Sequence, residues 1–245
     1  MAAFTYDLHV HSCLSPCADD DNTPNNIAGM GFLNGLKIMA LTDHNTCGNC
    51  PAFMKAAERY GLVGVPGMEL TTAEDIHLVC LFPTLEDALS FSEEISGKRR
   101  ILVPNRKDIF GGQFYMDEND EIIGEEEYFL SNATNVTVDE APALVRSFNG
   151  ICYPAHIDRQ ANGIVAVLGV FPEEPYFSAF ELHDLKNEAS LKKEFPILND
   201  KKAVTCSDAH YLQDLREEND SIELPVSPDA SPEEIRKKLI ETLSA

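Results

Sequence analysis

The sequence is short of basic side chains. Its 245 residues carry 19 Lys and Arg against 41 Asp and Glu, a formal net charge of -22. A surface this acidic repels nucleic-acid backbones and anionic membranes at long range, so we expect no long nucleic acid and no membrane as partners. The sequence also lacks an apolar run near the roughly 20 residues of a membrane span, and its first residues lack a basic start and an apolar signal core. These absences predict a cytoplasmic protein.

The rest of the composition is that of an ordinary globular protein, with 44% hydrophobic and 24% charged residues. Short apolar segments alternate with segments that begin and end as helices do, which predicts an α/β fold with a parallel sheet. Strands are expected at 5–10, 37–42, 62–70, 76–82, 151–156, 178–183 and 202–207, and helices at 24–36, 51–60, 84–96, 137–150 and 231–243.

One stretch, residues 106–135, interrupts this alternation. It is polar and rich in Gly and Glu, and we interpret it as an excursion from the sheet, with a hairpin and a loop. We refer to it below as the excursion segment. No linker or internal repeat divides the sequence, so residues 1–245 are expected to form a single domain.

Histidines gather at the ends of the expected strands, where the sites of α/β proteins assemble. Six of the seven lie there: His9 and His11 after the first strand, His44 after the second, then His156, His183 and His210. Two carboxylates, Glu69 and Asp208, occupy similar positions. His77 lies near the start of its strand and is the exception.

The spacing of these residues suggests a metal centre. Alternate residues of a strand point to the same face, so His9 and His11 can converge, as can Asp208 and His210. Imidazole and carboxylate together suit Zn, Fe or Mn. The eight candidate ligands exceed the need of one ion, which indicates a multinuclear centre.

These motifs match a known family. The segments Asp7-Leu8-His9-Val10-His11-Ser12, Leu41-Thr42-Asp43-His44-Asn45, Gly67-Met68-Glu69, His77, Pro154-Ala155-His156 and Ser207-Asp208-Ala209-His210 resemble those of the PHP (polymerase and histidinol phosphatase) family. The resemblance runs from Tyr6 to about Leu212. It implies a distorted seven-stranded β/α barrel and a metal-dependent phosphoesterase with two or three divalent ions.

The resemblance also implies a ligand set. His9, His11, Glu69 and Asp208 would hold one ion; Glu69 would bridge to a second, completed by His77 and His156; His44 and His210 would hold a third. Many members have Asp or His a few residues after the first pair, where this sequence has Pro16. The substitutes on offer are Cys17, Asp19 and Asp20, and a thiolate there would favour Zn or Fe.

Four cysteines raise a separate question. Cys13 and Cys17 follow the first histidine motif, and Cys47 and Cys50 follow the second. They are either an additional zinc or iron–sulfur site or reduced thiols in loops, and the spacing leaves both readings open.

Three further residues are candidates for roles around the metals. Arg159 follows His156 closely and is suited to grip a phosphate. His183 is a candidate for substrate contact, with a core role as its alternative. Asp43 is expected to orient its neighbouring ligand.

The function expected from this set is hydrolysis of a phosphate ester by a metal-bound hydroxide. Glu69 would bridge the metals, Arg159 would position the phosphate, and Asp208 or a nearby histidine would move a proton. A small phosphomonoester or a nucleotide suits the acidic surface. The alternatives are an exonuclease acting on short oligonucleotides and a non-catalytic metal sensor or assembly module. Oligomeric state is not predicted.

Overall fold

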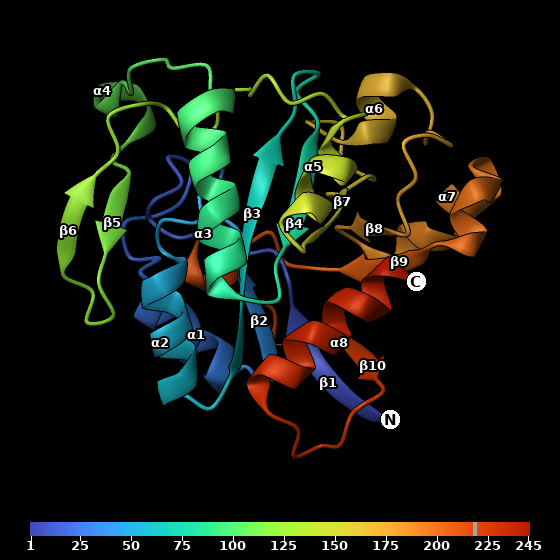
Figure 1. The fold of residues 1–245 in the computed structure, drawn as a ribbon, viewed down its shortest axis with the longest axis horizontal. Coiled ribbons are helices and arrows are strands. Elements are labelled where there is room, and N and C mark those ends of the chain that lie inside the picture. The colour runs from blue at the N-terminus through green and yellow to red at the C-terminus, as the bar shows by residue number, and fades with distance from the viewer. Residues whose placement is uncertain (218–219) are drawn as a thin grey trace.

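A computed structural model describes residues 1–217 and 220–245 of the chain (Figure 1). The strands are β1 Ala2–Asp7, β2 Ile38–Leu41, β3 Val63–Thr71, β4 His77–Leu81, β5 Phe114–Met116, β6 Ile122–Glu125, β7 Ile151–Pro154, β8 Ala179–Leu182, β9 Lys202–Thr205 and β10 Ser221–Leu224. The α-helices are α1 Pro24–Leu33, α2 Cys50–Arg59, α3 Leu85–Glu94, α4 Lys107–Phe110, α5 Ala141–Ser147, α6 Ile164–Leu168, α7 Glu188–Glu194 and α8 Pro232–Ser244. A π-helical turn, Ile95–Arg99, follows α3, and 3-10 turns lie at Leu185–Asn187, Pro196–Asp200 and Leu212–Asp214.

The described residues form a curled main sheet of six strands in the order β10-β1-β2-β3-β4-β7. A parallel pair, β8 and β9, lies beside it, and β5 and β6 form the hairpin of the excursion segment. The mixed α/β class is therefore confirmed, and each expected strand is present within a few residues. The seven-stranded barrel is not reproduced as one sheet in the described chain, because β8 and β9 pair with each other instead of extending the six strands.

The prediction of a parallel sheet is wrong for three of the five strand pairings in the main sheet. β1, β2 and β3 are parallel, whereas β4 is antiparallel to both β3 and β7, and β10 is antiparallel to β1. The turn at 72–76 joins β3 to β4, with Asp75 at a φ of 65° and its N–H donating to Thr72 O. A connection this short cannot cross over the sheet, so the next strand has to run backwards.

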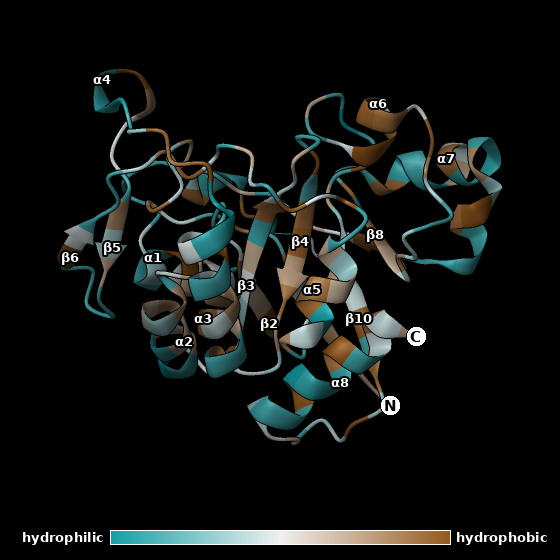
Figure 2. Cartoon of the chain, turned by 45° about the horizontal axis from the view of Figure 1, so that its top comes forward, coloured by the Kyte–Doolittle hydropathy of each residue, from teal (hydrophilic) through white to brown (hydrophobic). Residues whose placement is uncertain are grey.

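Apolar side chains cover both faces of the sheet. In β2, Ile38 and Ala40 join a cluster that includes Leu239 of α8, whereas Met39 and Leu41 join the cluster beneath the other helices. Figure 2 shows the matching pattern, with apolar strands between helices that are polar on their outer sides. The two faces explain why β2 reads as a continuous apolar run.

Helix starts follow the expected capping chemistry. Thr23, Thr84 and Ser231 each accept a hydrogen bond from the backbone N–H three residues ahead. The helix expected at 137–150 is shorter, because α5 begins only at Ala141. None of the helices in the described residues has the length and apolar character needed to cross a bilayer.

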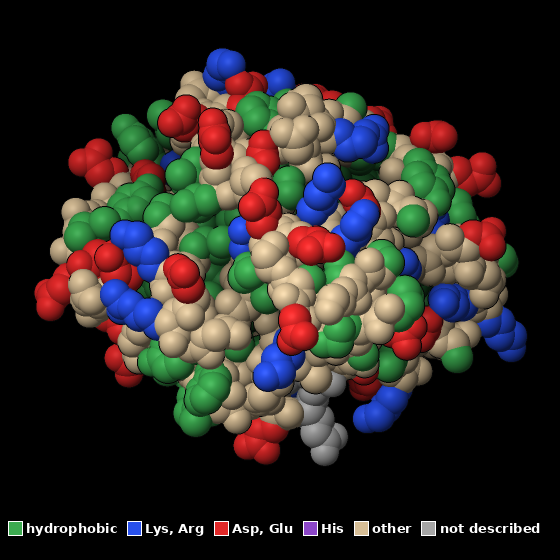
Figure 3. Space-filling model, turned by 60° about the horizontal axis from the view of Figure 1, so that its bottom comes forward, with side chains coloured by type: hydrophobic (Ala, Val, Ile, Leu, Met, Phe, Trp, Pro, Cys, Tyr) green, Lys and Arg blue, Asp and Glu red, His purple; other side chains and the backbone are tan. Residues whose placement is uncertain are grey.

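One edge of the sheet carries the polar loops. The carboxyl ends of β1, β2, β3 and β7 meet there with the amino end of β4, at the top of Figure 1. Figure 3 turns the bottom of the molecule toward the viewer, and acidic and basic side chains are interspersed on the face it shows. Among the described residues, no histidine is visible on that face.

Candidate metal centre

The direction of β4 explains the one histidine that seemed misplaced. His77 opens β4 and pairs with Thr71, the last residue of β3. Because β4 runs antiparallel, its first residue lies at the same edge as the last residues of its neighbours. His77 therefore meets His44, His156 and Glu69 at that edge.

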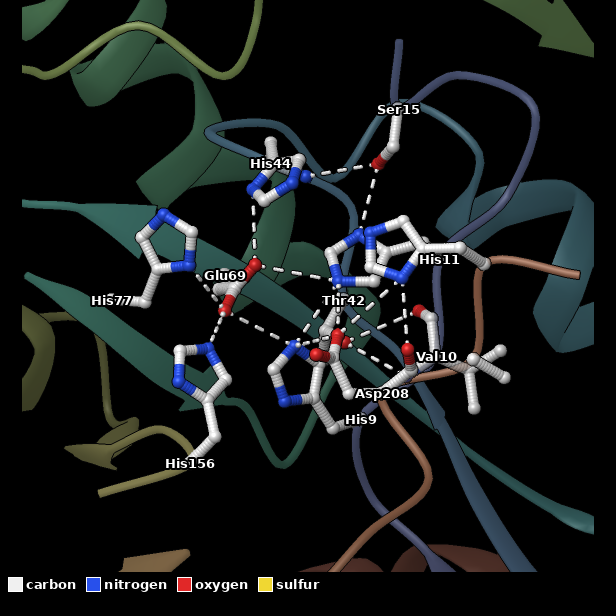
Figure 4. Close-up of polar contacts among 12 residues, drawn as sticks. His9, Val10, His11, Ser15, Thr42, His44, Glu69, His77, His156 and Asp208 are labelled. Atoms are coloured by element: carbon white, nitrogen blue, oxygen red, sulfur yellow. Dashed lines mark hydrogen bonds and ion pairs between the residues drawn. The ribbon is translucent and has the colours of Figure 1, made fainter. Parts of the chain in front are cut away.

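Glu69 lies at the centre of the site and is buried (Figure 4). Five imidazole rings surround its carboxylate. Oε1 lies 3.2 Å from His9 Nε2, 2.8 Å from His77 Nδ1 and 3.3 Å from His156 Nε2; Oε2 lies 3.3 Å from His11 Nε2 and 3.0 Å from His44 Nδ1.

Asp208 forms a second focus beside it. Its Oδ1 lies 3.4 Å from His9 Nε2, 3.2 Å from His11 Nε2 and 3.7 Å from His210 Nδ1. The eight residues expected as ligands are thus brought together. Seven of them, all but His156, form three overlapping groups of close donor atoms: His9, His11 and Asp208; His11, His44 and His210; and His44, Glu69 and His77.

The chemistry of these donors fits divalent cations. The Nε2 atoms of His9 and His11 lie 3.1 Å apart and face each other as well as the two carboxylates. At most one proton fits between two such nitrogens, and all these groups bind cations through lone pairs. Nitrogen and oxygen donors in a buried cluster suit Zn, Mn or Fe, in keeping with the expected cofactors.

Electrostatics inside the cluster are strong. Burial favours a neutral Glu69, but the positive charges of His77 and His9 outweigh it and hold the pKa of this carboxyl well below its usual range. Burial lowers the pKa of His44 to about 3 and that of His210 to about 4. These two rings are therefore neutral at pH 7, the form that binds a metal.

A buried carboxylate, Glu181 of β8, orients two of the candidate ligands. Its oxygens lie 3.0 and 3.1 Å from His9 Nδ1, and Oε1 accepts the backbone N–H of His156 at 3.2 Å. A carboxylate on the far nitrogen fixes the ring and strengthens it as a ligand. The sequence analysis assigns no role to Glu181, although this residue lies near the end of the strand expected at 178–183.

Asp43 acts on a different ligand from the one expected. Its carboxylate accepts hydrogen bonds from Ser12 N–H and from the hydroxyls of Ser12 and Ser15, each at 2.7 Å. Ser15 Oγ in turn lies 3.0 Å from His11 Nδ1. Asp43 therefore positions His11 through Ser15. For its neighbour His44, the link to Asp43 is the backbone N–H of His44, which donates to Ser15 Oγ.

Arg159 and His183 lie at the mouth of the cluster. The Nη1 of Arg159 donates to Asp208 Oδ2 at 2.5 Å, and Nη2 donates to His183 Nδ1 at 3.0 Å. Burial and the charge of Arg159 lower the pKa of His183, so its ring is neutral and accepts this bond. Asp158 accepts the backbone N–H of His183 and so holds the pair in place.

The substitutes considered for the third ion do not join the clustered donors. Asp19 and Asp20 are exposed, and Asp19 Oδ1 accepts the N–H of Asp21. Cys17 is exposed at a cavity that it shares with His44 and His77. In the part of the chain that is described, none of the three belongs to a group of close donors.

The four loop cysteines are not gathered into one site. The thiols of Cys47 and Cys50 both contact Gly67 O, at 3.1 and 3.5 Å, whereas that of Cys13 lies 3.8 Å from Phe114 O. The donor groups found among the described residues contain no cysteine. The arrangement favours reduced thiols over an additional metal site.

Comparison with protein families adds an independent finding. The model of the PHP domain matches residues 7–139, just over half of the chain. The chain belongs to the PHP domain family. The resemblance inferred from the motifs is thereby confirmed, and the family supports a metal-dependent hydrolase. A comparison with curated protein sequences finds no match.

Solved structures with the PHP-like fold include several hydrolases. Lesion-specific endonuclease Q from Pyrococcus furiosus is 19% identical with a TM-score of 0.67, covering 99% of this chain and 56% of that chain. An amidohydrolase from Chromobacterium violaceum with bound sulfate is 17% identical with a TM-score of 0.56, covering 95% and 96%. A protein from Bifidobacterium adolescentis, described as a metal-dependent phosphoesterase, is 16% identical with a TM-score of 0.54, covering 84% and 87%.

These structural likenesses concern the fold and not the substrate. At such identities they show the fold that the chains share. This PHP chain spans only 56% of the length of endonuclease Q. The substrate therefore has to be argued from the site itself.

Proposed function

We propose that this PHP protein is a phosphoesterase that hydrolyses a small phosphomonoester or a nucleotide, with residues 1–245 acting as one domain. The observation that carries the proposal is the surrounding of Glu69, where one buried carboxylate meets five imidazole nitrogens within 2.8 to 3.3 Å. A cavity of about 160 Å³ reaches this cluster and is also lined by Arg159, Asp208 and His210. The cavity therefore brings the candidate metal ligands together with Arg159, a group suited to bind an anion.

The ligand assignment is the one that the family resemblance implies. His9, His11, Glu69 and Asp208 would hold one divalent ion, His77 and His156 would complete a second with Glu69, and His44 and His210 would hold a third. When bound, such ions acidify a water molecule and offset negative charge on the phosphate.

Arg159 is assigned to the phosphate. Its guanidinium is part-exposed in the cavity and is fixed in direction by Asp208 and His183. A planar guanidinium held in this way binds two oxygens of a phosphate with little further loss of side-chain freedom. His183 contributes by keeping Arg159 aimed.

The protons are handled by groups already in the cavity. The oxygen of water forms a bond to phosphorus while the ester P–O bond breaks, and the departing oxygen takes up a proton. The water gives up a proton as its oxygen bonds to phosphorus, and Asp208 or a nearby histidine such as His210 would carry a proton to the departing oxygen, since both line the cavity with Arg159.

Phosphate release would test the proposal. The protein, loaded in turn with Mn, Zn or Fe, is given phosphomonoesters, nucleotides and short oligonucleotides. We expect turnover in the parent that collapses in His156→Ala and persists in the matched surface variant Lys186→Ala. A parent that holds metal but releases no phosphate from any of them would overturn the proposal in favour of a sensor or assembly role.

A second candidate function is cleavage of a nucleic-acid strand. Endonuclease Q, a lesion-specific endonuclease, aligns with 99% of this chain. This likeness argues mildly against our expectation that no long nucleic acid is a partner. A charge of -22 still favours short strands over duplexes. Cleavage of a 5-mer whose rate falls steeply with added salt would support this candidate, and salt-independent release from monoesters would argue against it.

A further inference from the structure

A second cavity opens directly beside the metal centre. Its volume is about 420 Å³, within the range of small-molecule sites. It shares His44, His77 and Asn162 with the smaller cavity that reaches Glu69. A ligand with its phosphate at the metal centre would therefore extend its organic part into this second space.

The excursion segment supplies an aromatic wall to the second cavity. The rings of Phe110 and Phe129 lie with centroids 4.4 Å apart, tilted by 34°. Phe110 is 42% exposed and its neighbour Ile109 is 57% exposed. Exposed apolar side chains grouped beside a polar site indicate a surface built for contact.

The wall is held in place by the backbone around it. Asn105 Nδ2 donates to Gly111 O at 2.9 Å, closing the short α4 turn, and Gly111 has a φ of 80° that a glycine adopts without strain. Phe129 N–H donates to Val103 O at 2.7 Å. The two rings are thus presented by paired backbone.

The rest of the lining is uncharged and polar. Beyond the apolar groups and the two histidines, the cavity is bounded by Cys17, Ser131 and Asn162. Among the described residues that line it, none is Lys, Arg, Asp or Glu. Flat apolar rings flanked by a hydroxyl and an amide suit a planar ring with polar edges. A polyol would leave the rings unused, and an alkyl chain would leave the polar groups unpaired.

We propose that Phe110 and Phe129 form a stacking wall for the nucleobase of the substrate, and that they make this site selective for phosphate esters that carry a base. The inference rests on the proposed hydrolysis and names its substrate class. The base belongs either to a free nucleotide or to an unpaired nucleotide at the end of a strand, since both present the same ring to the wall.

The test compares adenosine 5′-monophosphate with ribose 5-phosphate, which has the same phosphate and sugar but no base. In the metal-loaded parent we expect kcat/KM to favour the nucleotide by about tenfold or more. Phe110→Ala and Phe129→Ala should bring that ratio close to one. Phe110→Trp should keep it, and Phe110→Leu, which preserves much of the bulk, should lose it.

The control is Ile123→Ala, because Ile123 belongs to the same segment, is 68% exposed and does not line the cavity. It should leave the ratio at the parent value. A parent ratio near one, or a ratio unchanged in Phe110→Ala and Phe110→Leu, would overturn the stacking wall while leaving hydrolysis intact.

A binding measurement separates the two proposals. A phosphonate analogue of the nucleotide has no ester bond to cleave, and its affinity can be measured by calorimetry. If no substrate is hydrolysed but the analogue binds the parent at least about tenfold tighter than Phe110→Leu, the hydrolysis proposal fails and the wall stands. A 5′-phosphorylated trinucleotide, compared with the monophosphate, identifies whether the preferred base is free or at a strand end.

Discussion

The metal centre and the excursion segment border the same cavity but are built in opposite ways. Donors such as His9, Glu69 and His156 lie on or just after strands of the sheet and are buried. Phe110 and Phe129 come from a short helix and a loop, and Phe110 is partly accessible to solvent. The rigid part would supply the chemistry that the PHP fold offers, and the outer part would select what reaches it.

The two regions also hold their shape by different means. Two donors in the metal centre are restrained by a further buried polar group: Glu181 restrains His9 and Ser15 restrains His11. The excursion segment is attached by backbone hydrogen bonds, by the side-chain amides of Asn45 and Asn49, and by carboxylates such as Glu118 and Glu126. Changes in the first region should therefore abolish metal binding, whereas changes in the second should alter selectivity or local stability.

The largest effect is expected for Glu69→Gln. Replacing the carboxylate removes the charge that five histidines share, so we expect loss of bound metal and a fall in turnover of at least about a thousandfold. Metal content by mass spectrometry and phosphate release would measure both. Glu127→Gln, on the exposed loop, is the matched control. Retention of parent metal content by Glu69→Gln would show that the donors do not depend on their shared carboxylate.

A smaller loss is expected for Glu181→Gln. The amide keeps the size of the side chain but no longer offers a charged acceptor to His9 Nδ1, so metal affinity should fall about 10- to 100-fold. Competition with a chelator would give the affinity. Glu223→Gln, an exposed change on β10, should match the parent. An unchanged affinity in Glu181→Gln would mean that the sheet alone orients His9.

Arg159→Lys should act on substrate more than on metal. A lysine keeps the charge but loses the two-pronged contact, so we expect KM for the phosphate ester to rise about tenfold with metal content retained. Steady-state kinetics and metal analysis separate the two effects, with Arg146→Lys as a surface control. If metal were lost instead, Arg159 would serve mainly to hold Asp208.

The smallest effect is expected for Glu126→Gln in the excursion segment. Burial favours a neutral carboxyl, but hydrogen bonds from Arg100, the N–H of Tyr128 and the hydroxyl of Tyr115 outweigh it and lower the pKa of Glu126. After screening by solvent, the variant should lose about 1 kcal/mol at pH 7, or about 2–4 °C in Tm.

The stability lost in Glu126→Gln depends on pH, and the lowered pKa of Glu126 fixes the direction of that dependence. A carboxyl with a lowered folded pKa stabilises the protein above its unfolded pKa of about 4.3, and this contribution disappears as pH falls through the folded value. Thermal unfolding of parent and Glu126→Gln should therefore differ at pH 7 and converge in acid. A difference that persists unchanged at pH 3 would point to packing in place of charge.

The sequence was informative where chemistry and strand ends coincide. His9, His11, His44 and Glu69 could be placed together because short apolar runs end just before or at them, and strand ends share an edge. The orientation of β4 was missed although the connection at 72–76 is too short for a crossover, because the alternation of strands and helices elsewhere favoured a parallel sheet. His77 therefore looked misplaced until pairing showed which way its strand runs.

Long-range contacts set the remaining limits. Glu181 reaches His9 across most of the chain, and no local pattern marks such a partner. The approach of Phe110 to Phe129 depends on how the excursion segment folds back, which its polar composition does not indicate. The strand β10 was missed because its pairing with β1 joins opposite ends of the sequence.

The position of helix α8 affects how substrate would enter the site and how product would leave it. Its apolar side chains pack into the same cluster as Leu8 and Ala155, the chain neighbours of His9 and His156, so the donors are backed there by filled core. Substrate and product would then have to use the same entrance, between the excursion segment and the loop of Arg159. Released phosphate would occupy the place where the next substrate binds. It should therefore act as a competitive inhibitor, and its dissociation should limit the rate of turnover.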